Sequence, residues 1–320
     1  MIDPGLRVYR WDLDKTYLLT DFDSIRGLVR SAVEPAWAKK AVPGATALVR
    51  ELGREGPGWR PRVCIVSGSP TQMRQKLEDK LRIDGVRYDS LVLKDNLSNL
   101  RRGRLRAVKA QFGYKLPELV AGRVGLGAAV RESLFGDDAE IDAVVYSVYA
   151  DAIAGRIGSV ELSRVLEAGG AYGDDIVATL ASLRRVALAD AVERIFIRLD
   201  RGRPFAEFAD LGARVIPIRT WYAAALVLVS VGELRPSSLA PVLAGSGLTD
   251  EAALGELEDV LTRGHADVAG LRSALSSLPT GSARLLAHDW AHRPPTAPHP
   301  IDYLGVLERF HPRSKPVRKT

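Results

Sequence analysis

The chain has 320 residues, of which 46% are hydrophobic and 26% charged, a composition typical of a globular protein and not of a disordered one. A single cysteine, Cys64, excludes an internal disulfide, and no apolar stretch reaches the roughly 20 residues needed to cross a bilayer, so we expect a cytoplasmic protein without a transmembrane segment. The formal net charge of +6 favours an anionic partner.

Short apolar runs alternate with helical patterns over the first two thirds of the chain. The expected strands are residues 6–11, 62–66, 91–93, 133–135, 192–199 and 213–218. The expected helices are residues 23–40, 44–52, 73–81, 116–124 and 204–211, with a buried helix over residues 221–231. This alternation predicts an α/β domain over residues 1–232, with a parallel sheet between two layers of helices.

The pattern changes near residue 233. From there to residue 293 it contains helices only, for example one with Leu254, Leu257, Val260 and Leu261 on a single face, which predicts a helical C-terminal extension. Residues 294–320 carry six prolines and several basic residues, a composition that predicts an extended and poorly ordered tail.

Polar residues follow three of the predicted strands directly. Asp12 and Asp14 come after the first strand, Ser67 after the second and Asp137 after the fourth. Ligands of open α/β sheets bind beyond the carboxyl ends of the strands, so this placement indicates a binding or catalytic site. Two alternatives stay open, because an Asp-x-Asp pair is common on surfaces and acidic residues such as Asp137 also cap helices.

Four segments of the chain resemble the motifs of haloacid dehalogenase (HAD) superfamily phosphatases, in the same order along the chain. The matching residues are Asp12, Asp14 and Thr16 for the first motif, Ser67 for the second, Lys115 for the third, and Asp137 with Asp142 for the fourth.

Shorter segments are similar to the phosphatidate phosphatase group of that superfamily, which includes the lipins and the actin-patch-associated enzymes. These segments are Ser67-Gly68-Ser69-Pro70, Leu93-Lys94-Asp95, the fourth motif followed by Tyr146, and Ile195-Phe196-Ile197-Arg198. Lys15 departs from the pattern, because those enzymes usually carry Asp or Gly there.

The resemblance implies a Rossmann-like HAD fold and a magnesium-dependent hydrolase of phosphate monoesters that forms an aspartyl-phosphate. Asp12 is the expected nucleophile, and Asp14 the group that protonates the leaving oxygen and then activates water. Magnesium prefers oxygen ligands. The expected metal-binding residues are Asp12, Asp14, Asp137, Asp138 and Asp142.

Cations and hydrogen-bond donors are expected to hold the phosphate. Lys115 is the expected catalytic lysine and Lys94 its rival, while Ser67 and the backbone of a turn at Gly68 are expected to donate to phosphoryl oxygens. Thr16 and Lys94 complete the expected substrate-binding set.

The spacing of about 50 residues between the first two motifs predicts a small cap and an open site that admits large substrates. The expected substrate is phosphatidate or another lipid phosphate, or else a phosphoprotein or other large phosphate ester. Two further alternatives stay open: transfer of the phosphoryl group to an acceptor other than water, and a non-catalytic module that binds anionic lipid.

A basic run could contact an anionic membrane; it contains Arg101, Arg102, Arg104, Arg106 and Lys109. A solvated helix face is the alternative, and nucleic acid is not expected because no aromatic residues are interleaved for base stacking. His288 and His292 have a spacing that suits a metal, but the sequence offers no further ligands beside them.

Overall fold

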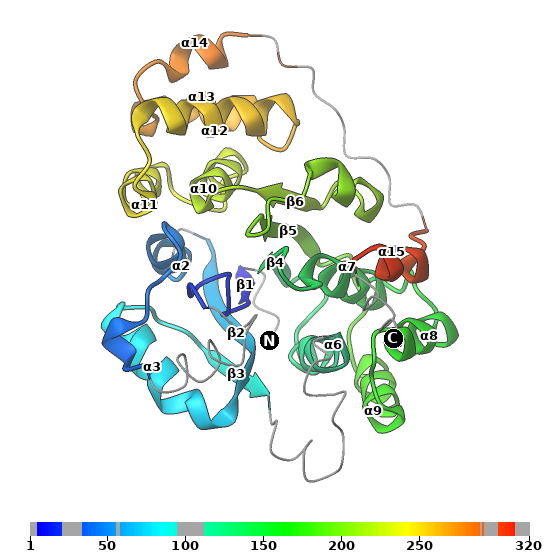
Figure 1. Ribbon diagram of the computed structural model, residues 1–320. Coiled ribbons are helices and arrows are strands. Elements are labelled where there is room, and N and C mark those ends of the chain that lie inside the picture. The colour runs from blue at the N-terminus through cyan, green and yellow to red at the C-terminus, as the bar shows by residue number, and fades with distance from the viewer. Residues whose placement is uncertain are drawn as a thin grey trace, which may run out of the picture.

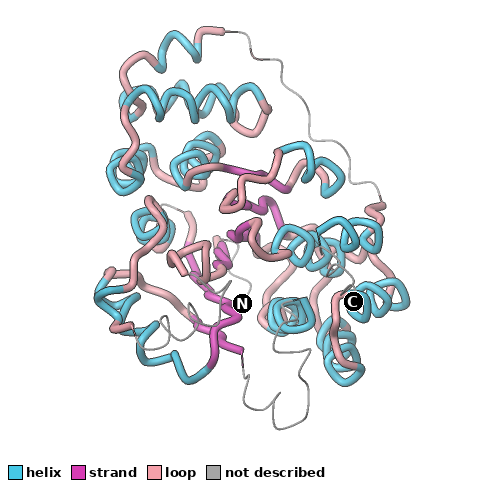
Figure 2. The backbone as a smooth tube through the Cα atoms, in the orientation of Figure 1, coloured by secondary structure: helices cyan, strands magenta, loops and turns pink. Residues whose placement is uncertain are grey.

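The computed structural model describes residues 5–20, 34–55, 58–94, 112–288, 290 and 300–310. A parallel sheet of six strands forms its centre (Figures 1 and 2). The strands are β1 (Leu6–Trp11), β2 (Arg60–Pro70), β3 (Ser90–Lys94), β4 (Arg131–Asp137), β5 (Val192–Arg198) and β6 (Val215–Ile218). Their spatial order is β3-β2-β1-β4-β5-β6, so the chain changes direction across the sheet between β1 and β4. Such a switch point is where open α/β sheets bind their ligands.

Helices cover both faces of the sheet (Figure 1). One hydrophobic cluster joins a sheet face to α2 (Ala45–Leu52), α3 (Arg74–Ile83) and α10 (Trp221–Ser230). A second cluster joins the other face to α6 (Phe112–Ala121), α7 (Asp142–Ile153), α8 (Ser159–Ala168) and α9 (Gly173–Leu183). The predicted α/β architecture, a parallel sheet flanked by helices, is therefore confirmed.

The segment after α10 forms α11 (Leu239–Ser246), α12 (Asp250–Thr262), α13 (Val268–Ser273) and α14 (Ser282–Leu286), with short 3-10 turns at Pro236–Ser238 and Leu275–Ser277. Every residue of α10 is buried, because the sheet lies on one side of it and α11, α12 and α13 on the other. Leu257 and Val260 of α12 belong to the same hydrophobic cluster as Trp11 of β1. The helices of the predicted extension thus share the core of the sheet domain.

Several element boundaries differ from the predicted ones. Helix α6 begins at Phe112, four residues before the predicted start, because Phe112, Leu116, Leu119 and Val120 form one continuous apolar face. Residues 205–211 form a 3-10 helix (η3, Phe205–Leu211) that ends at Gly212, where φ is +82°. Of the predicted helix over residues 23–40, residues 23–33 lie outside the described chain, and Ala36–Ala38 form a 3-10 turn (η1).

The predicted extended tail contains a helix, α15 (Tyr303–Phe310), which packs on α7 and α8. Tyr303, Val306, Leu307 and Phe310 are buried at helical spacing, and the Tyr303 hydroxyl donates a hydrogen bond of 2.6 Å to Asp151 Oδ2. The apolar face of this segment therefore outweighs the prolines that precede it. Residues 294–299 and 311–320 lie outside the described chain.

Three other predictions also fall on residues that the structure does not describe. These are the basic run over residues 101–109, the residue Asp95, and the His288–His292 pair, of which only His288 is described. The predicted small cap falls between the first two motifs, and residues 21–33 of that interval are likewise undescribed. Within the described part of the chain, no helix combines the length and the apolar composition needed to cross a bilayer.

Candidate active site

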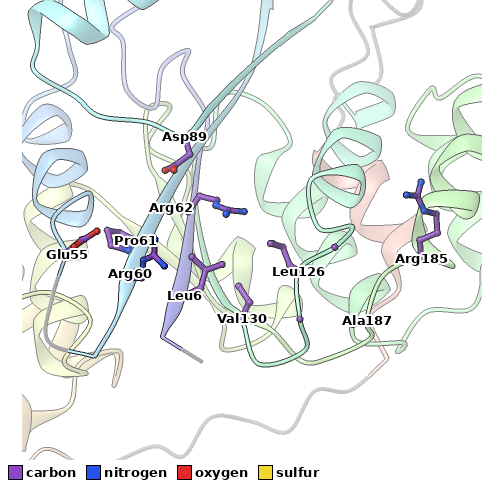
Figure 3. A pocket seen from close by; sticks show the side chains of 12 residues that line it. Leu6, Glu55, Arg60, Pro61, Arg62, Asp89, Leu126, Val130, Arg185 and Ala187 are labelled. Atoms are coloured by element: carbon purple, nitrogen blue, oxygen red, sulfur yellow. The ribbon is translucent and has the colours of Figure 1, made fainter. Parts of the chain in front are cut away.

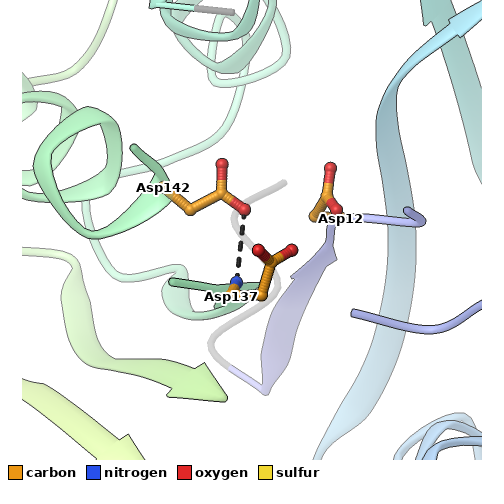
Figure 4. Close-up of side chains that lie close together, drawn as sticks. All are labelled: Asp12, Asp137 and Asp142. Atoms are coloured by element: carbon orange, nitrogen blue, oxygen red, sulfur yellow. Dashed lines mark hydrogen bonds between the residues drawn. The ribbon is translucent and has the colours of Figure 1, made fainter. Parts of the chain in front are cut away.

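Three aspartates meet where β1 and β4 end at the switch point (Figure 4). Asp12 directly follows β1, Asp137 is the last residue of β4, and Asp142 is the first residue of α7. All three are buried, and one carboxylate oxygen from each lies within 4.8 Å of those of the other two. The Asp12 backbone N–H donates to Phe135 O at 2.9 Å, which fixes the end of β1 against β4. Residues from distant parts of the sequence thus form one acidic triad: Asp12, Asp137 and Asp142.

Gly136 allows this close approach. A Cβ atom at residue 136 would lie 2.6 Å from Asp142 Oδ2 and 2.8 Å from the ring of Tyr146. With glycine there, the start of α7 comes close enough for the Asp137 backbone N–H to donate to Asp142 Oδ2 at 3.4 Å (Figure 4). The glycine of the Gly-Asp motif therefore has a steric role.

Lys115 of α6 supplies a cation to the triad. Its Nζ lies 2.8 Å from Asp12 Oδ1, 2.5 Å from Asp142 Oδ1 and 2.8 Å from Glu140 Oε2. Burial alone would lower the pKa of the Lys115 ammonium, but the three carboxylates outweigh burial and raise that pKa well above its ordinary value. Lys115 is thus held as a cation beside Asp12. The sequence did not reveal Glu140, which contacts Lys115 because the turn after β4 brings it back toward α6.

Asp14 is held by two serines. Its Oδ2 accepts hydrogen bonds from Ser67 Oγ at 2.9 Å and from Ser69 Oγ at 2.7 Å, and all three residues are buried. Burial raises the pKa of Asp14 to about 6, against the opposing effect of the serine hydrogen bonds. A carboxyl group with a pKa near neutrality suits an exchange of protons with substrate and water. Ser69 was not among the predicted site residues; its position two residues after Ser67 in an extended strand is the signal for it.

The turn predicted at Gly68 is wrong. Strand β2 stays extended through Pro70, and α3 begins only at Arg74, after a 3-10 turn over Thr71–Met73. The residue before a proline is disfavoured in the helical region, which keeps Ser69 extended. As a consequence Ser67 and Ser69 face the same side of β2 and reach the same carboxylate.

Thr16 supports the triad. Its Oγ1 donates to Asp137 Oδ2 at 2.9 Å, while its carbonyl oxygen accepts from Trp221 Nε1 at 3.1 Å. Trp221 belongs to an aromatic layer beneath the site, in which Trp11 stacks on Phe135 with ring centroids 4.3 Å apart. This layer gives the loop after β1 a rigid base.

Asp138 does not join the triad, contrary to the prediction that places it among the metal ligands. Its Oδ1 accepts from the backbone N–H groups of Asp200 at 2.6 Å and Arg201 at 2.7 Å, and its Oδ2 from that of Arg203 at 3.2 Å. Asp138 lies in the turn that follows β4, and there its carboxylate accepts hydrogen bonds from the loop after β5.

Lys94, the predicted rival of Lys115, is buried at the end of β3. Its Nζ lies 5.6 Å from the centre of the Tyr114 ring, and burial lowers its pKa to about 8. Of the two lysines, it is Lys115 whose Nζ the structure places 2.8 Å from Asp12 Oδ1.

The donor set of the triad fits a hard divalent cation. Asp12 Oδ2 and Asp14 Oδ1 are buried and accept no hydrogen bond from the described residues. Burial, followed by the charges of Asp142, Glu140 and Asp137, raises the pKa of Asp12 well above its ordinary value even though Lys115 opposes this. A cation held by the triad would pair with Asp12 Oδ2 and offset the crowded negative charge, and oxygen-only ligands suit Mg²⁺.

A cavity of about 700 Å³ lies at the opposite, amino end of the strands (Figure 3). Leu6, Arg60, Arg62, Val130 and Arg185 are among its lining residues. Functional residues of parallel α/β sheets lie at the carboxyl ends of the strands, so the candidate active site is the triad and not this cavity.

Comparisons with known proteins give no relative: no protein-family model, no curated protein and no solved structure matches the chain.

Proposed function

We propose that the protein is a magnesium-dependent phosphohydrolase of the HAD type, in which Asp12 attacks the phosphorus of a phosphate monoester. One observation carries the proposal: the Asp12 carboxylate shares a buried site with Asp137, Asp142 and the Lys115 ammonium at the switch point of a parallel sheet. Binding alone does not require a carboxylate to face a phosphate, whereas nucleophilic catalysis does.

In the proposed reaction an Asp12 oxygen attacks phosphorus, the bond from phosphorus to the leaving oxygen breaks, and an aspartyl-phosphate forms. Asp14, fixed by Ser67 and Ser69 with its Oδ1 unpaired, donates a proton to the leaving oxygen. It then takes a proton from the water that hydrolyses the aspartyl-phosphate. Lys115 neutralises charge on Asp12 and the phosphoryl oxygens.

Mg²⁺ held by Asp12 and Asp137 would reduce the repulsion between a phosphate and the carboxylates. Asp142 holds Lys115 in place through a contact of 2.5 Å, and Thr16 orients Asp137. Ser67 Oγ accepts from the Ser69 backbone N–H at 3.0 Å and has a single proton, which it donates to Asp14 in the substrate-free protein. With substrate bound, this proton would turn to a phosphoryl oxygen beside the Gly68 backbone, while Ser69 keeps Asp14 in place. Lys94 would provide further positive charge near the substrate.

The test is phosphate release from an aryl phosphate in the presence of Mg²⁺. Asp12→Asn removes the nucleophile at nearly constant volume, so we expect hydrolysis to fall by at least about 10³-fold. Circular dichroism and thermal unfolding should show a folded protein. Full activity of folded Asp12→Asn would refute the proposal, as would wild-type hydrolysis that is unaffected by a chelator.

The substrate proposed from the resemblance is a lipid phosphate such as phosphatidate. Rates on phosphatidate in mixed micelles, on a soluble alkyl phosphate and on a phosphopeptide would compare the three classes directly. A kcat/KM highest for the phosphopeptide would replace the lipid proposal, whereas the Asp12 chemistry would be unaffected.

A further inference from the structure

The turn that carries the nucleophile has an unusual backbone conformation at Lys15. Among the described residues, Lys15 is the one non-glycine residue with positive φ, at +60°. Positive φ is unfavourable for residues other than glycine, because the Cβ atom clashes with the backbone. It persists only where the surrounding structure enforces it. Lys15 lies between Asp14 and Thr16, so its conformation sets the direction of both neighbouring side chains.

Arg198 holds the Lys15 turn from the opposite side of the site. It is the last residue of β5, and its Nε and Nη2 donate to the Lys15 carbonyl oxygen at 3.2 and 2.6 Å. Nη2 also contacts Asp200 Oδ1 at 2.5 Å, and only 12% of the Arg198 side chain is exposed. A planar guanidinium with two donors on one oxygen fixes the direction as well as the position of that carbonyl.

Asp138 in turn holds the loop that begins at Arg198. Its carboxylate accepts from the backbone N–H groups of Asp200, Arg201 and Arg203, and its own N–H donates to Arg198 O at 3.1 Å. Asp138 follows Asp137 of the triad directly. A continuous set of contacts therefore runs from the end of β4, through the loop after β5, to the turn that carries Asp12 and Asp14.

We propose that Arg198, held by Asp138, is a positioning residue that keeps the Lys15 turn in its positive-φ conformation, so that Asp12 and Asp14 stay aligned with Asp137. This inference rests on the proposed hydrolase function for its kinetic effect. Its structural part, the tethering of the turn, can be measured without any substrate.

Arg198→Ala is the test variant, and Arg272→Ala is its matched control. Arg272 also donates Nε and Nη2 to one backbone carbonyl, that of Leu286 at 2.9 and 2.7 Å, but does so among the C-terminal helices. We expect Arg198→Ala to lower kcat by about 100-fold with KM changed by less than about threefold, because small misplacements of reacting groups have effects of this size. Arg272→Ala should keep the wild-type kcat.

Two further measurements separate positioning from general destabilisation. Hydrogen exchange of residues 13–18 in the substrate-free protein should be faster in Arg198→Ala than in wild type and unchanged in Arg272→Ala. Guanidinium at about 20 mM, far below denaturing concentrations, should restore at least about tenfold of the lost activity in Arg198→Ala. Arg198→Lys, which keeps the charge but not the fork of donors, should have intermediate activity.

The inference is overturned if folded Arg198→Ala hydrolyses as fast as Arg272→Ala, or if residues 13–18 exchange at the wild-type rate in both variants. The inference is also overturned if guanidinium does not restore activity and if both Arg198→Ala and Arg198→Lys lose cooperative unfolding. Arg198 would then be needed for the fold as a whole. Absence of hydrolysis in the wild type would refute the proposed function instead, and the exchange experiment would still decide whether Arg198 tethers the turn.

Discussion

Gly136 is the residue at which one added methyl group should separate the triad. A Cβ there would come within 2.6 Å of Asp142 Oδ2, so Gly136→Ala must push Asp142 or α7 away from β4. We expect the rate of hydrolysis to fall by about 100-fold and the free energy of unfolding to fall by about 1–3 kcal/mol.

Gly173→Ala is the control for that substitution. A Cβ at residue 173, at the start of α9, would meet open space, so the variant should keep its activity and gain up to about 1 kcal/mol of stability. Equal activities of the two variants, measured on the same aryl phosphate, would contradict the steric role of Gly136.

Ser69 offers a test of the acid role of Asp14 that depends on the leaving group. Ser69→Ala removes the 2.7 Å hydrogen bond to Asp14 Oδ2 but leaves the one from Ser67. An alkyl phosphate needs protonation of its leaving oxygen, whereas a nitrophenolate leaves readily without it. We therefore expect kcat to fall about 10-fold or more on an alkyl phosphate and to change by less than about threefold on a nitrophenyl phosphate.

Ser163→Ala, at a half-buried serine that donates to Ser159 O within α8, should leave both rates unchanged. Equal losses on the two substrates in Ser69→Ala would show that Ser69 does not act through the acid role of Asp14.

The sequence predicted which acidic residues lie near strand ends, but not the directions of their side chains. Asp12, Ser67 and Asp137 lie near the carboxyl ends of strands that run parallel, so their convergence is a consequence of the topology. Asp138 was assigned to the metal as an acid of the fourth motif, but the turn after β4 directs its carboxylate to the loop after β5. Glu140 reaches the site through the turn after β4, which no local pattern specifies. Ser69, by contrast, could have been found from its position two residues after Ser67 in an extended strand.

Among the elements, β1, β4 and α7 are joined by a buried network of charges. Glu132 of β4 accepts from Arg10 Nε at 2.6 Å, from Arg123 Nη1 at 2.8 Å and from the Tyr149 hydroxyl at 2.8 Å. Burial alone would raise the pKa of the Glu132 carboxyl, but the two guanidinium groups outweigh it and hold that pKa below its usual value. The network therefore stabilises the folded state when Glu132 is ionised.

A carboxyl group whose pKa is lower in the folded state stabilises the fold above its unfolded pKa, here roughly 4.3, and loses this effect as the pH falls through the folded pKa. Glu132→Gln leaves Arg10 and Arg123 buried without their partner. It should lower the free energy of unfolding at neutral pH by about 3–5 kcal/mol.

Urea unfolding at several pH values measures this effect. The difference between wild type and Glu132→Gln should be constant above about pH 5.5 and should shrink below about pH 4. A difference that grows on acidification would have the wrong sign for an ionised Glu132. Glu161→Gln, at an exposed residue in the first turn of α8, should show no comparable difference.

Elements were predicted well from runs of apolar residues in the sequence, and poorly from amino-acid composition. All six strands and α10 overlap the predicted residues, because buried β-rich runs and an eleven-residue apolar stretch have few alternatives. The largest difference is in β2, which ends at Pro70, four residues beyond its predicted end. The tail was predicted as extended from its prolines. The spacing of Tyr303, Val306 and Phe310 was the better signal, since α15 is held by packing on α7 and α8 and by Asp151.

At the scale of the whole molecule, the alternation of strands and helices was sufficient to predict a parallel sheet with helices on both faces. The order β3-β2-β1-β4-β5-β6 could not be read from that alternation, because local patterns do not say on which side of β1 the fourth strand pairs. The same order decides the site, since it makes β1 and β4 neighbours and places their carboxyl ends together.

The neighbouring position of β1 and β4 also has a consequence for how the protein is made. The first three strands can assemble while the remainder of the chain is still being synthesised, and at that stage Asp12 has neither acidic partner nor lysine. Thr16 and Asp137 are 121 residues apart and meet only when β4 pairs with β1. The repulsion between the carboxylates of the triad therefore opposes this late step and not the earlier assembly of β1, β2 and β3. A divalent ion that binds only after β4 has paired with β1 would stabilise the fully folded state and so favour this last step.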